Sequence, residues 1–272
     1  MDNELFSVRD RVAIVTGGLG NLGQRFCVTL VNAGARVACC DIAETTKIHV
    51  PGFAEKRNDG SIHVFRVDLT KRHHLEETLT ELHELWGWPS ILINNAGLHS
   101  PPGAPAEENG PFETYPESSY NLIMDANLKG MFLSCQVFGG AMAKEKHGSI
   151  VNIASTYGLV SPNQDIYAYK RKDGTQWFKP AAYAVAKSAV FNLTRYLATY
   201  WAHQGVRVNT LTPGGIFENQ DKEFLSEYEK RVPMGRMADP DEMNGAVLFL
   251  ASQASSYVTG ANIVVDGGWT AW

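Results

Sequence analysis

Seven short apolar segments, each of strand length, alternate with helical patterns along the whole chain. The segments are 12–16, 37–40, 62–67, 91–94, 149–153, 206–211 and 263–265. Near-continuous apolar runs of this length are typical of strands that are covered by helices on both faces. Strands that alternate with helices predict an α/β protein with a doubly wound, parallel, seven-stranded sheet.

Size and charge limit the classes of protein to which the chain can belong. It has 272 residues, 44% of them hydrophobic, which suits one domain spanning 1–272. A net charge of −5 with no long Lys/Arg cluster argues against a nucleic-acid partner. No run approaches the ~20 apolar residues that span a bilayer, and the start, MDNELFSVRD, is unlike a secretory signal. We expect a cytoplasmic protein with no membrane partner.

The cysteines indicate a reduced compartment and no metal site. All of them lie in apolar stretches without CxxC spacing, at Cys27, Cys39, Cys40 and Cys135. Cysteines in such surroundings are expected to behave as small buried hydrophobic residues.

Three irregular stretches interrupt the alternation, and each follows a predicted strand. They cover 98–119 after the fourth strand, 156–180 after the fifth and 213–240 after the sixth. In an open α/β sheet, ligands bind outside the carboxyl ends of the strands. We expect these three loops to form the walls of a substrate site.

The first strand leads into the turn TGGLGNLG at 16–23, which has the context of a dinucleotide-binding turn of a Rossmann fold. Gly18, Gly20 and Gly23 match GxGxxG, a spacing that lets backbone N–H groups approach a pyrophosphate at a helix N-terminus. A glycine-rich bend that only joins two elements is the alternative. Asp41, at the end of the second strand, favours the dinucleotide, because a carboxylate there accepts the ribose hydroxyls and repels a 2′-phosphate. The pair of features predicts NAD rather than NADP, although Asp41 by itself also fits a helix N-cap.

Tyr183 and Lys187 are spaced i, i+4 in PAAYAVAKSAV and therefore share one face of a predicted helix. Exposed Tyr/Lys pairs at this spacing are common, but the apolar neighbours make an unpaired phenol and ammonium costly here. A phenol with an ordinary pKa near 10 must be stabilised as an anion before it acts as a base near neutral pH. A nearby ammonium and a positively charged nicotinamide supply such stabilisation.

With these residues, the chain resembles the short-chain dehydrogenases/reductases over nearly its whole length. The resemblance is carried by TGGLGNLG (16–23), VDL (67–69), NNAG (94–97), ANLKG (126–130), VNIAS (151–155), YAVAK (183–187), RVNTLTPGG (207–215) and SSYVTGANIVVDGG (255–268). No single motif suffices, but the set is specific.

The resemblance implies roles for particular residues. Tyr183 would be the general base or acid, Lys187 would bind the nicotinamide ribose and lower the tyrosine pKa, and Ser155 would hydrogen-bond the substrate oxygen. Asn127 would support a water that relays protons. The implied coenzyme contacts are Gly17, Gly20, Asn21, Leu22, Gly23, Asp41, Asp68, Leu69, Asn94, Ala96, Gly97, Tyr183, Lys187, Pro213, Gly214 and Ile216.

Two departures from the family pattern lie near the coenzyme positions. The pattern TGxxxGxG places glycine where this chain has Asn21, and we expect the turn to survive because Asn tolerates positive φ. Near position 218 the family often has a threonine that touches the nicotinamide, and this chain has Glu218 there. The glycines also fit TGxxGxxG, the pattern of nucleotide-sugar epimerases and dehydratases, although those enzymes usually carry a larger C-terminal domain.

The gap between Ser155 and Tyr183 is about twice the family's usual length, so residues 161–178 form an insert beside the catalytic residues. The insert and its flank are basic and aromatic, with Lys170, Arg171, Lys172, Lys179, Tyr167, Tyr169, Trp177 and Phe178. Such a flap suits a polar or anionic substrate, and a solvated loop is the alternative. His99, just after NNAG, either faces the substrate or is an ordinary loop residue.

We therefore predict an NAD-dependent enzyme that interconverts a secondary alcohol and a ketone, on a sugar, sugar acid or sugar derivative. An NAD-retaining epimerase or dehydratase, and a non-catalytic NAD-binding protein, are the alternatives. The resemblance also implies a homo-oligomer, a dimer or tetramer.

Overall fold

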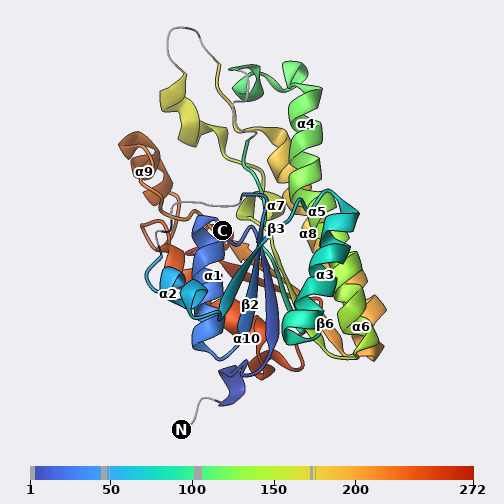
Figure 1. Ribbon diagram of the computed structural model, residues 1–272. Helices are drawn as coiled ribbons and strands as arrows, with labels where there is room; N and C mark the ends of the chain where they lie inside the picture. The colour runs from blue at the N-terminus through green and yellow to red at the C-terminus, as the bar shows by residue number, and fades with distance from the viewer. Residues whose placement is uncertain (1–3, 44–47, 49, 101–105, 172–173, 175) are drawn as a thin grey trace.

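A single seven-stranded parallel sheet forms the centre of the protein in a computed structural model (Figure 1). The structure describes residues 4–43, 48, 50–100, 106–171, 174 and 176–272. The strands are β1 (Val12–Thr16), β2 (Arg36–Asp41), β3 (Ile62–Arg66), β4 (Ile91–Asn94), β5 (Gly148–Ile153), β6 (Val206–Pro213) and β7 (Asn262–Val265), in the spatial order β3-β2-β1-β4-β5-β6-β7. The order reverses between β1 and β4, which makes the carboxyl ends of these two strands the topological switch point.

Helices cover both faces of the sheet, as the apolar strand pattern predicts. The described helices are α1 (Asn21–Asn32), α2 (Phe53–Asn58), α3 (Arg72–Trp86), α4 (Glu117–Met124), α5 (Gly130–Ser134), α6 (Gly140–Lys144), α7 (Thr156–Leu159), α8 (Ala181–Trp201), α9 (Lys222–Glu229) and α10 (Asn244–Ala251). Helices α1, α2 and α10 bury apolar side chains in one cluster against the sheet. Helices α3, α5, α6 and α8 do so in a second cluster on the opposite face.

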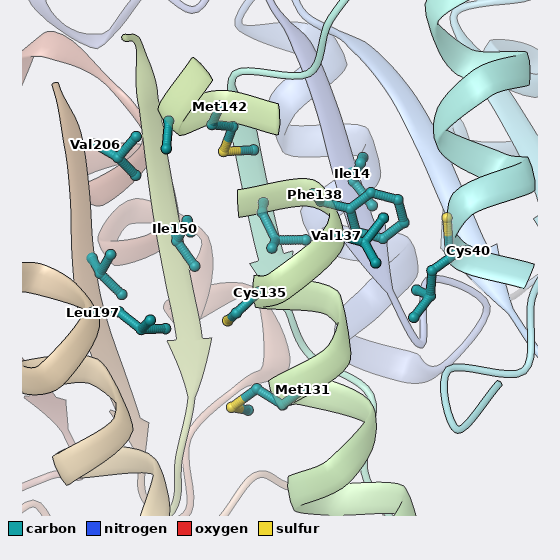
Figure 2. Close-up of a cluster of buried hydrophobic side chains, with 14 of the residues drawn as sticks. Ile14, Cys40, Met131, Cys135, Val137, Phe138, Met142, Ile150, Leu197 and Val206 are labelled. Atoms are coloured by element: carbon teal, nitrogen blue, oxygen red, sulfur yellow. The ribbon is translucent and has the colours of Figure 1, made fainter. Parts of the chain in front are cut away.

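Alternating side chains of β1 separate the two clusters. Ile14 lies in the cluster formed with α3, α5, α6 and α8, which Figure 2 shows, whereas Ala13 and Val15 lie in the other. Phe138 is fully buried in the first cluster. Each face of the sheet is thus packed, which is the condition for an all-parallel sheet.

The sequence-based expectations for the fold are confirmed with small shifts. All seven predicted strands are present, and β1 and β4 have the predicted bounds. All four cysteines are free and buried. On α3, Leu75 and Leu82 pack into the core, whereas Leu85 is 46% exposed. Ten residues after Leu75, the 3.6-residue repeat of an α-helix has rotated Leu85 out of the buried face.

The three irregular stretches follow β4, β5 and β6 and extend beyond the sheet, where Figure 1 shows α9 and the upper end of α4. They contain more regular structure than the sequence suggested. The stretch 213–240 includes α9, and 156–180 includes α7 and a 3-10 helix, Gln164–Lys170. Helix α9 buries Tyr228 against Met237, so tertiary packing stabilises a helix in a segment rich in Gly and Pro.

Among the described residues, no helix combines the length and the hydrophobicity that crossing a membrane requires. The described residues also contain no group of three or more His, Cys, Asp or Glu side chains that would hold a metal ion.

Candidate active site

A cavity of about 500 Å³ opens at the carboxyl ends of β1, β2 and β4. Nine of the residues that the family resemblance assigned to coenzyme binding line it: Gly17, Gly20, Asn21, Leu22, Asp41, Asp68, Leu69, Ala96 and Gly97. The cavity lies at the switch point of the strand order, where open α/β sheets bind nucleotides.

The turn after β1 is shaped by two glycines and one amide. Gly17 has φ 60°, and a Cβ there would lie 2.7 Å from the Cα of Ala96. A Cβ at Gly23 would overlap with the carbonyl oxygen of Gly17, so Gly23 lets the start of α1 pack against the turn. The side chain of Asn95 donates hydrogen bonds to the carbonyl oxygens of Thr16 and Gly17, at 3.2 and 3.0 Å. The result is a rigid loop at the N-terminus of α1 that suits an anionic ligand.

Asn21 does not take the positive φ that we expected of it. It is the first residue of α1, and the positive φ of the turn falls on Gly17 instead. The Asn21 side chain donates a 2.6 Å hydrogen bond to Oε1 of Glu218, and both residues line the cavity. Asn21 and Glu218, the two positions that depart from the family pattern, therefore contact each other across the cavity. They stand where the family often has Gly and Thr.

Asp41 is held by the turn that it faces. Its Oδ2 accepts the backbone N–H of Leu19 at 3.0 Å, and its Oδ1 accepts that of Ala43 at 3.1 Å. The carboxylate is half-buried and lines the cavity at the end of β2. Its position fits an acceptor for ribose hydroxyls.

Asp68 and Leu69 line the cavity on the side of β3. Oδ1 of Asp68 accepts hydrogen bonds from the backbone N–H and the hydroxyl of Thr70, at 2.9 and 2.7 Å. Burial raises the pKa of Asp68, but the two Thr70 hydrogen bonds outweigh burial and the pKa lies below its ordinary value. Asp68 therefore carries a negative charge at neutral pH.

Five other residues assigned to the coenzyme lie elsewhere in the structure. Asn94 is buried and donates a 2.9 Å hydrogen bond to Asn152 Oδ1, which ties β4 to β5, while its neighbour Asn95 lines the cavity. Gly23, Pro213, Gly214 and Ile216 are not among the residues that line the cavity.

Tyr183, Ser155 and Lys187 come together next to this cavity. Ser155 is the N-cap of α7, where its hydroxyl accepts the N–H of Tyr157 at 3.2 Å, and its interaction with the Tyr183 side chain lowers the pKa of that phenol. Lys187, one turn after Tyr183 on α8, lies with its Nζ 5.9 Å from the centroid of the Tyr183 ring. Gly97 connects this group with the cavity, because a Cβ at Gly97 would come 3.4 Å from Lys187 Nζ.

The protein surroundings of Tyr183 favour the neutral phenol. Burial raises the pKa of Tyr183 to about 12, while the hydrogen bond from Ser155 lowers it and Tyr157 raises it. Burial likewise lowers the pKa of Lys187 to about 8, and its ammonium donates a 2.8 Å hydrogen bond to the carbonyl of Ile153. The pKa values of both groups are therefore shifted from their ordinary values, which is typical of catalytic residues.

The buried ammonium of Lys187 predicts a pH-dependent stability difference. Because its pKa is lower in the folded protein than in the unfolded chain, the unfolded chain binds the extra proton above about pH 8. Lys187 therefore lowers stability below pH 8, and this cost disappears as pH rises toward 10. We expect the unfolding free energy of wild type, minus that of Lys187→Met, to rise by about 2 kcal/mol between pH 8 and 9.5 in urea titrations. Lys144→Met, at an exposed site, serves as the control, and a difference that stays constant with pH would contradict the expectation.

Asn127 uses its whole side chain to hold the loop after β4. Its Nδ2 donates to the carbonyl oxygens of Leu98 and Ile123, at 2.9 and 3.0 Å, and its Oδ1 accepts the N–H of Leu98 at 3.1 Å. It lies in a π-helical segment, Asp125–Lys129, and is fully buried. In this structure Asn127 positions the Gly97 and Leu98 wall of the site.

His99 lies against the ring of Tyr183. Its ring centroid lies 4.6 Å from that of Tyr183, and the planes are tilted by 31°. Although the residue is exposed on one side, burial of the ring and the charges of Lys179 and Lys187 hold the pKa of His99 below its ordinary value. The imidazole is therefore neutral at pH 7 and available as a hydrogen-bond partner for a substrate.

The insert packs mainly on itself and on α9. Lys170 lies 4.9 Å from the centroid of the Trp177 ring and 3.8 Å from Asp221, and the Tyr169 hydroxyl donates a 2.7 Å hydrogen bond to Asp221. Arg171 donates to the carbonyl oxygens of Gln164 and Trp177. Lys172 and Asp173 lie outside the described residues. Of the described cations in and beside the insert, Lys179 is the one whose ammonium lies over Tyr183, 5.7 Å from its ring centroid.

Several residues of the cavity were not identified from the sequence. They include Leu19, Ile42, Val67, Thr70, Asn95, Leu98, Ala126 and Glu218. Asn95 could have been predicted, because it belongs to the same NNAG motif as Asn94. Side chains alternate along a strand, so one of the two asparagines points into the core and the other into the cavity. The contact between Asn21 and Glu218 spans 197 positions and leaves no local signal.

Comparison with known proteins agrees with this geometry. The family model described as enoyl-(acyl carrier protein) reductase matches residues 19–270. An NAD-dependent glycerol dehydrogenase of Listeria innocua is 30% identical over 97% of this chain and 96% of its own. A galactitol 2-dehydrogenase of Rhizobium johnstonii is 33% identical over 96% and 95%. The crystal structure of a gluconate 5-dehydrogenase from Burkholderia cenocepacia, in complex with NADP and tartrate, superimposes with a TM-score of 0.84 and 27% identity over 99% of this chain and 98% of that one.

The match extends over nearly the whole length of the chain and of its relatives. Parallel strands, a glycine turn and the Ser155, Tyr183 and Lys187 group all lie where the sequence motifs placed them. The chain belongs to the short-chain dehydrogenase/reductase family of oxidoreductases.

Proposed function

We propose that the protein oxidises a secondary alcohol of a polyol or sugar derivative to a ketone, reversibly, with NAD as coenzyme. The observation that carries this proposal is the group formed by Ser155, Tyr183 and Lys187 beside the nucleotide cavity. The relatives named above act on glycerol and galactitol by their names, which supports a polyhydroxylated substrate.

The chain's own residues account for the proton transfer. Bound NAD would supply a hydride acceptor, its oxidised nicotinamide ring. The Tyr183 oxygen takes the proton of the substrate hydroxyl, and Ser155 holds the same substrate oxygen by a hydrogen bond. Lys187 contributes a positive charge 5.9 Å from the Tyr183 ring, which favours the phenolate. In the reverse direction, Tyr183 returns the proton to the alkoxide.

Asp41 supports NAD over NADP. Its carboxylate lines the cavity at the end of β2, where it would accept hydrogen bonds from ribose hydroxyls and repel a 2′-phosphate. The gluconate 5-dehydrogenase that binds NADP shows that the fold accepts either coenzyme, so this single side chain is what favours NAD here.

Glu218 adds a third carboxylate to the cavity, after Asp41 and Asp68, and its removal should tighten coenzyme binding. Bringing a pyrophosphate near the exposed Glu218 costs Coulomb energy, which Glu218→Gln abolishes while a hydrogen-bond acceptor for Asn21 remains. We expect the Kd of NADH, measured by fluorescence titration, to fall roughly two- to fivefold at low salt. Glu223→Gln on α9 is the matched control, and weaker NADH binding by Glu218→Gln would contradict the expectation.

The function is tested by following NADH formation with purified protein. The panel contains galactitol, D-arabinitol, glycerol, gluconate and their phosphates, each with NAD and with NADP. The proposal expects stoichiometric NADH and ketone from at least one polyol. Turnover without net NADH would instead favour the epimerase alternative, and coenzyme binding without any turnover would favour a non-catalytic protein.

We also propose that the protein is a cytoplasmic homo-oligomer, a dimer or tetramer. Free buried cysteines suit a reducing compartment. Large apolar side chains on α8 are exposed, including Val185, Tyr196 and Tyr200, and a second subunit would cover them.

A further inference from the structure

A second cavity, of about 410 Å³, lies between the loop after β4 and the segment that leads into α8. Its lining includes Glu108, Tyr115, Phe178 and Lys179. Lys179 also lies over the ring of Tyr183, so this cavity adjoins the catalytic group. Nothing in the mechanism above uses it.

Two polar side chains in this cavity are buried and lack partners. Glu108, in the 3-10 helix Ala106–Asn109, is 1% exposed, and among the described residues neither carboxylate oxygen has a hydrogen-bond partner. The hydroxyl of Tyr115 is likewise buried and unpartnered. Buried polar atoms are nearly always hydrogen-bonded, and a buried carboxylate without partners is costly. A ligand that donates hydrogen bonds would remove this cost.

The backbone holds Glu108 and Lys179 on the same wall. Phe178 N–H donates to the carbonyl of Asn109 at 2.7 Å, and the Asn109 side chain donates to the carbonyl of Phe178 at 3.2 Å. This pairing joins the loops after β4 and β5 at the positions next to Glu108 and Lys179. Gln164 Oε1 accepts the N–H of Lys179 at 2.8 Å and fixes the same segment.

The charges of Glu108 and Lys179 interact, but the two groups leave room between them. Burial and the charge of Lys170 lower the pKa of Lys179 to about 8, while the Glu108 carboxylate raises it. Because neither Glu108 oxygen is hydrogen-bonded, the ammonium does not satisfy the carboxylate directly. One positive and one negative group at a distance favour an uncharged ligand that can both donate and accept hydrogen bonds. A sugar acid would meet repulsion from Glu108, and a cation would meet repulsion from Lys179.

We infer that this cavity, the Glu108 subsite, binds the hydroxyl groups of an uncharged polyol chain whose secondary alcohol lies at Tyr183. Hydroxyls of the chain donate to Glu108 and accept from Lys179 and Tyr115. This inference rests on the proposed function and narrows its substrate class from sugars and sugar acids to neutral polyols and sugars.

The test uses Glu108→Gln in the full-length protein. We compare kcat/KM for the best accepted of galactitol, D-arabinitol and glycerol with kcat/KM for propane-1,2-diol, which has a secondary alcohol but only one further hydroxyl. The polyol-to-diol ratio is expected to fall about tenfold or more in Glu108→Gln, since a charged hydrogen-bond acceptor is lost. Tyr115→Phe is expected to change the ratio in the same direction, by roughly threefold.

A second measurement separates binding from a structural role. If Glu108 serves substrate binding, Glu108→Gln removes an unpaired buried charge, and the thermal midpoint is expected to rise by about 1–4 °C. A structural role predicts a lower midpoint. Glu107→Gln, at the exposed neighbouring position, is the matched control and should change neither the ratio nor the midpoint.

The outcomes distinguish this inference from the proposed function. An unchanged ratio, a lower midpoint, or a wild-type preference for gluconate over the polyols overturns the Glu108 subsite while alcohol oxidation stands. If the wild-type protein oxidises none of the polyols, the diol or gluconate with either coenzyme, the proposed function itself fails.

Discussion

Replacing Tyr183 with Phe is expected to lower kcat for alcohol oxidation by about 10²–10⁴-fold, the usual contribution of a general base. The substitution removes the hydroxyl that takes the substrate proton and leaves the ring that packs against His99. NADH affinity is expected to stay within about twofold, because Tyr183 does not line the nucleotide cavity. Steady-state kinetics and NADH fluorescence titration measure the two quantities.

The size of this effect depends on how the phenolate is reached. The protein alone holds the pKa of Tyr183 at about 12, so working near pH 7 to 8 requires a lowering of four to five units, or about 6 kcal/mol. A positive charge at about 6 Å contributes about 3 kcal/mol at an effective dielectric constant of 20. Bound NAD would add the positive charge of its oxidised nicotinamide ring to the field of the protein and would lower the pKa of Tyr183 further. The pH profile of kcat should rise toward alkaline pH and level off or fall once the Lys187 ammonium, with a pKa of about 8, loses its proton.

Tyr196→Phe provides the matched control for this experiment. It removes a phenol from the same helix at a site that is 63% exposed and distant in sequence from the catalytic group. If Tyr196→Phe keeps normal turnover and Tyr183→Phe loses it, the result supports Tyr183 as the general base. A Tyr183→Phe variant that keeps wild-type kcat on an accepted polyol would show that another group carries the proton.

Strand positions and the grouping of Tyr183 with Lys187 could be predicted because each depends on local sequence. A run such as 91–93 is apolar on every residue, and only burial on both faces of a sheet accommodates such a run. The i, i+4 spacing of Tyr183 and Lys187 fixes their common face once α8 forms. Asp41 follows in the same way from the end of β2.

Other features depend on segments that meet only in the folded chain. No local pattern connects Asn21 with Glu218, or Glu108 with Lys179, because the two members of each pair follow different strands. His99 remained ambiguous for the same reason: its role depends on the Tyr183 ring that lies against it.

Removing the Asp41 carboxylate is expected to reverse or abolish the preference between coenzymes. Two hydrogen bonds from ribose hydroxyls to a charged acceptor are each worth about 1.5–3 kcal/mol, so Asp41→Ala should raise the Kd of NADH roughly 10²-fold. The same change removes a repelling charge from the position of a 2′-phosphate, so NADPH binding should become tighter. Fluorescence titrations with both reduced coenzymes measure the two shifts.

The opposite signs of these two shifts make the Asp41 experiment decisive, because Asp41 also supports the glycine turn. Its oxygens accept the N–H groups of Leu19 and Ala43, and loss of these bonds alone would distort the turn. A distorted turn weakens both coenzymes, since both place a pyrophosphate at the start of α1. Asp41→Asn keeps a neutral acceptor for Leu19 and is expected to retain the turn, with a smaller loss of NADH affinity and the same gain for NADPH. Equal weakening of NADH and NADPH in both variants would show that Asp41 acts on the turn, and the basis for choosing NAD would then lie elsewhere.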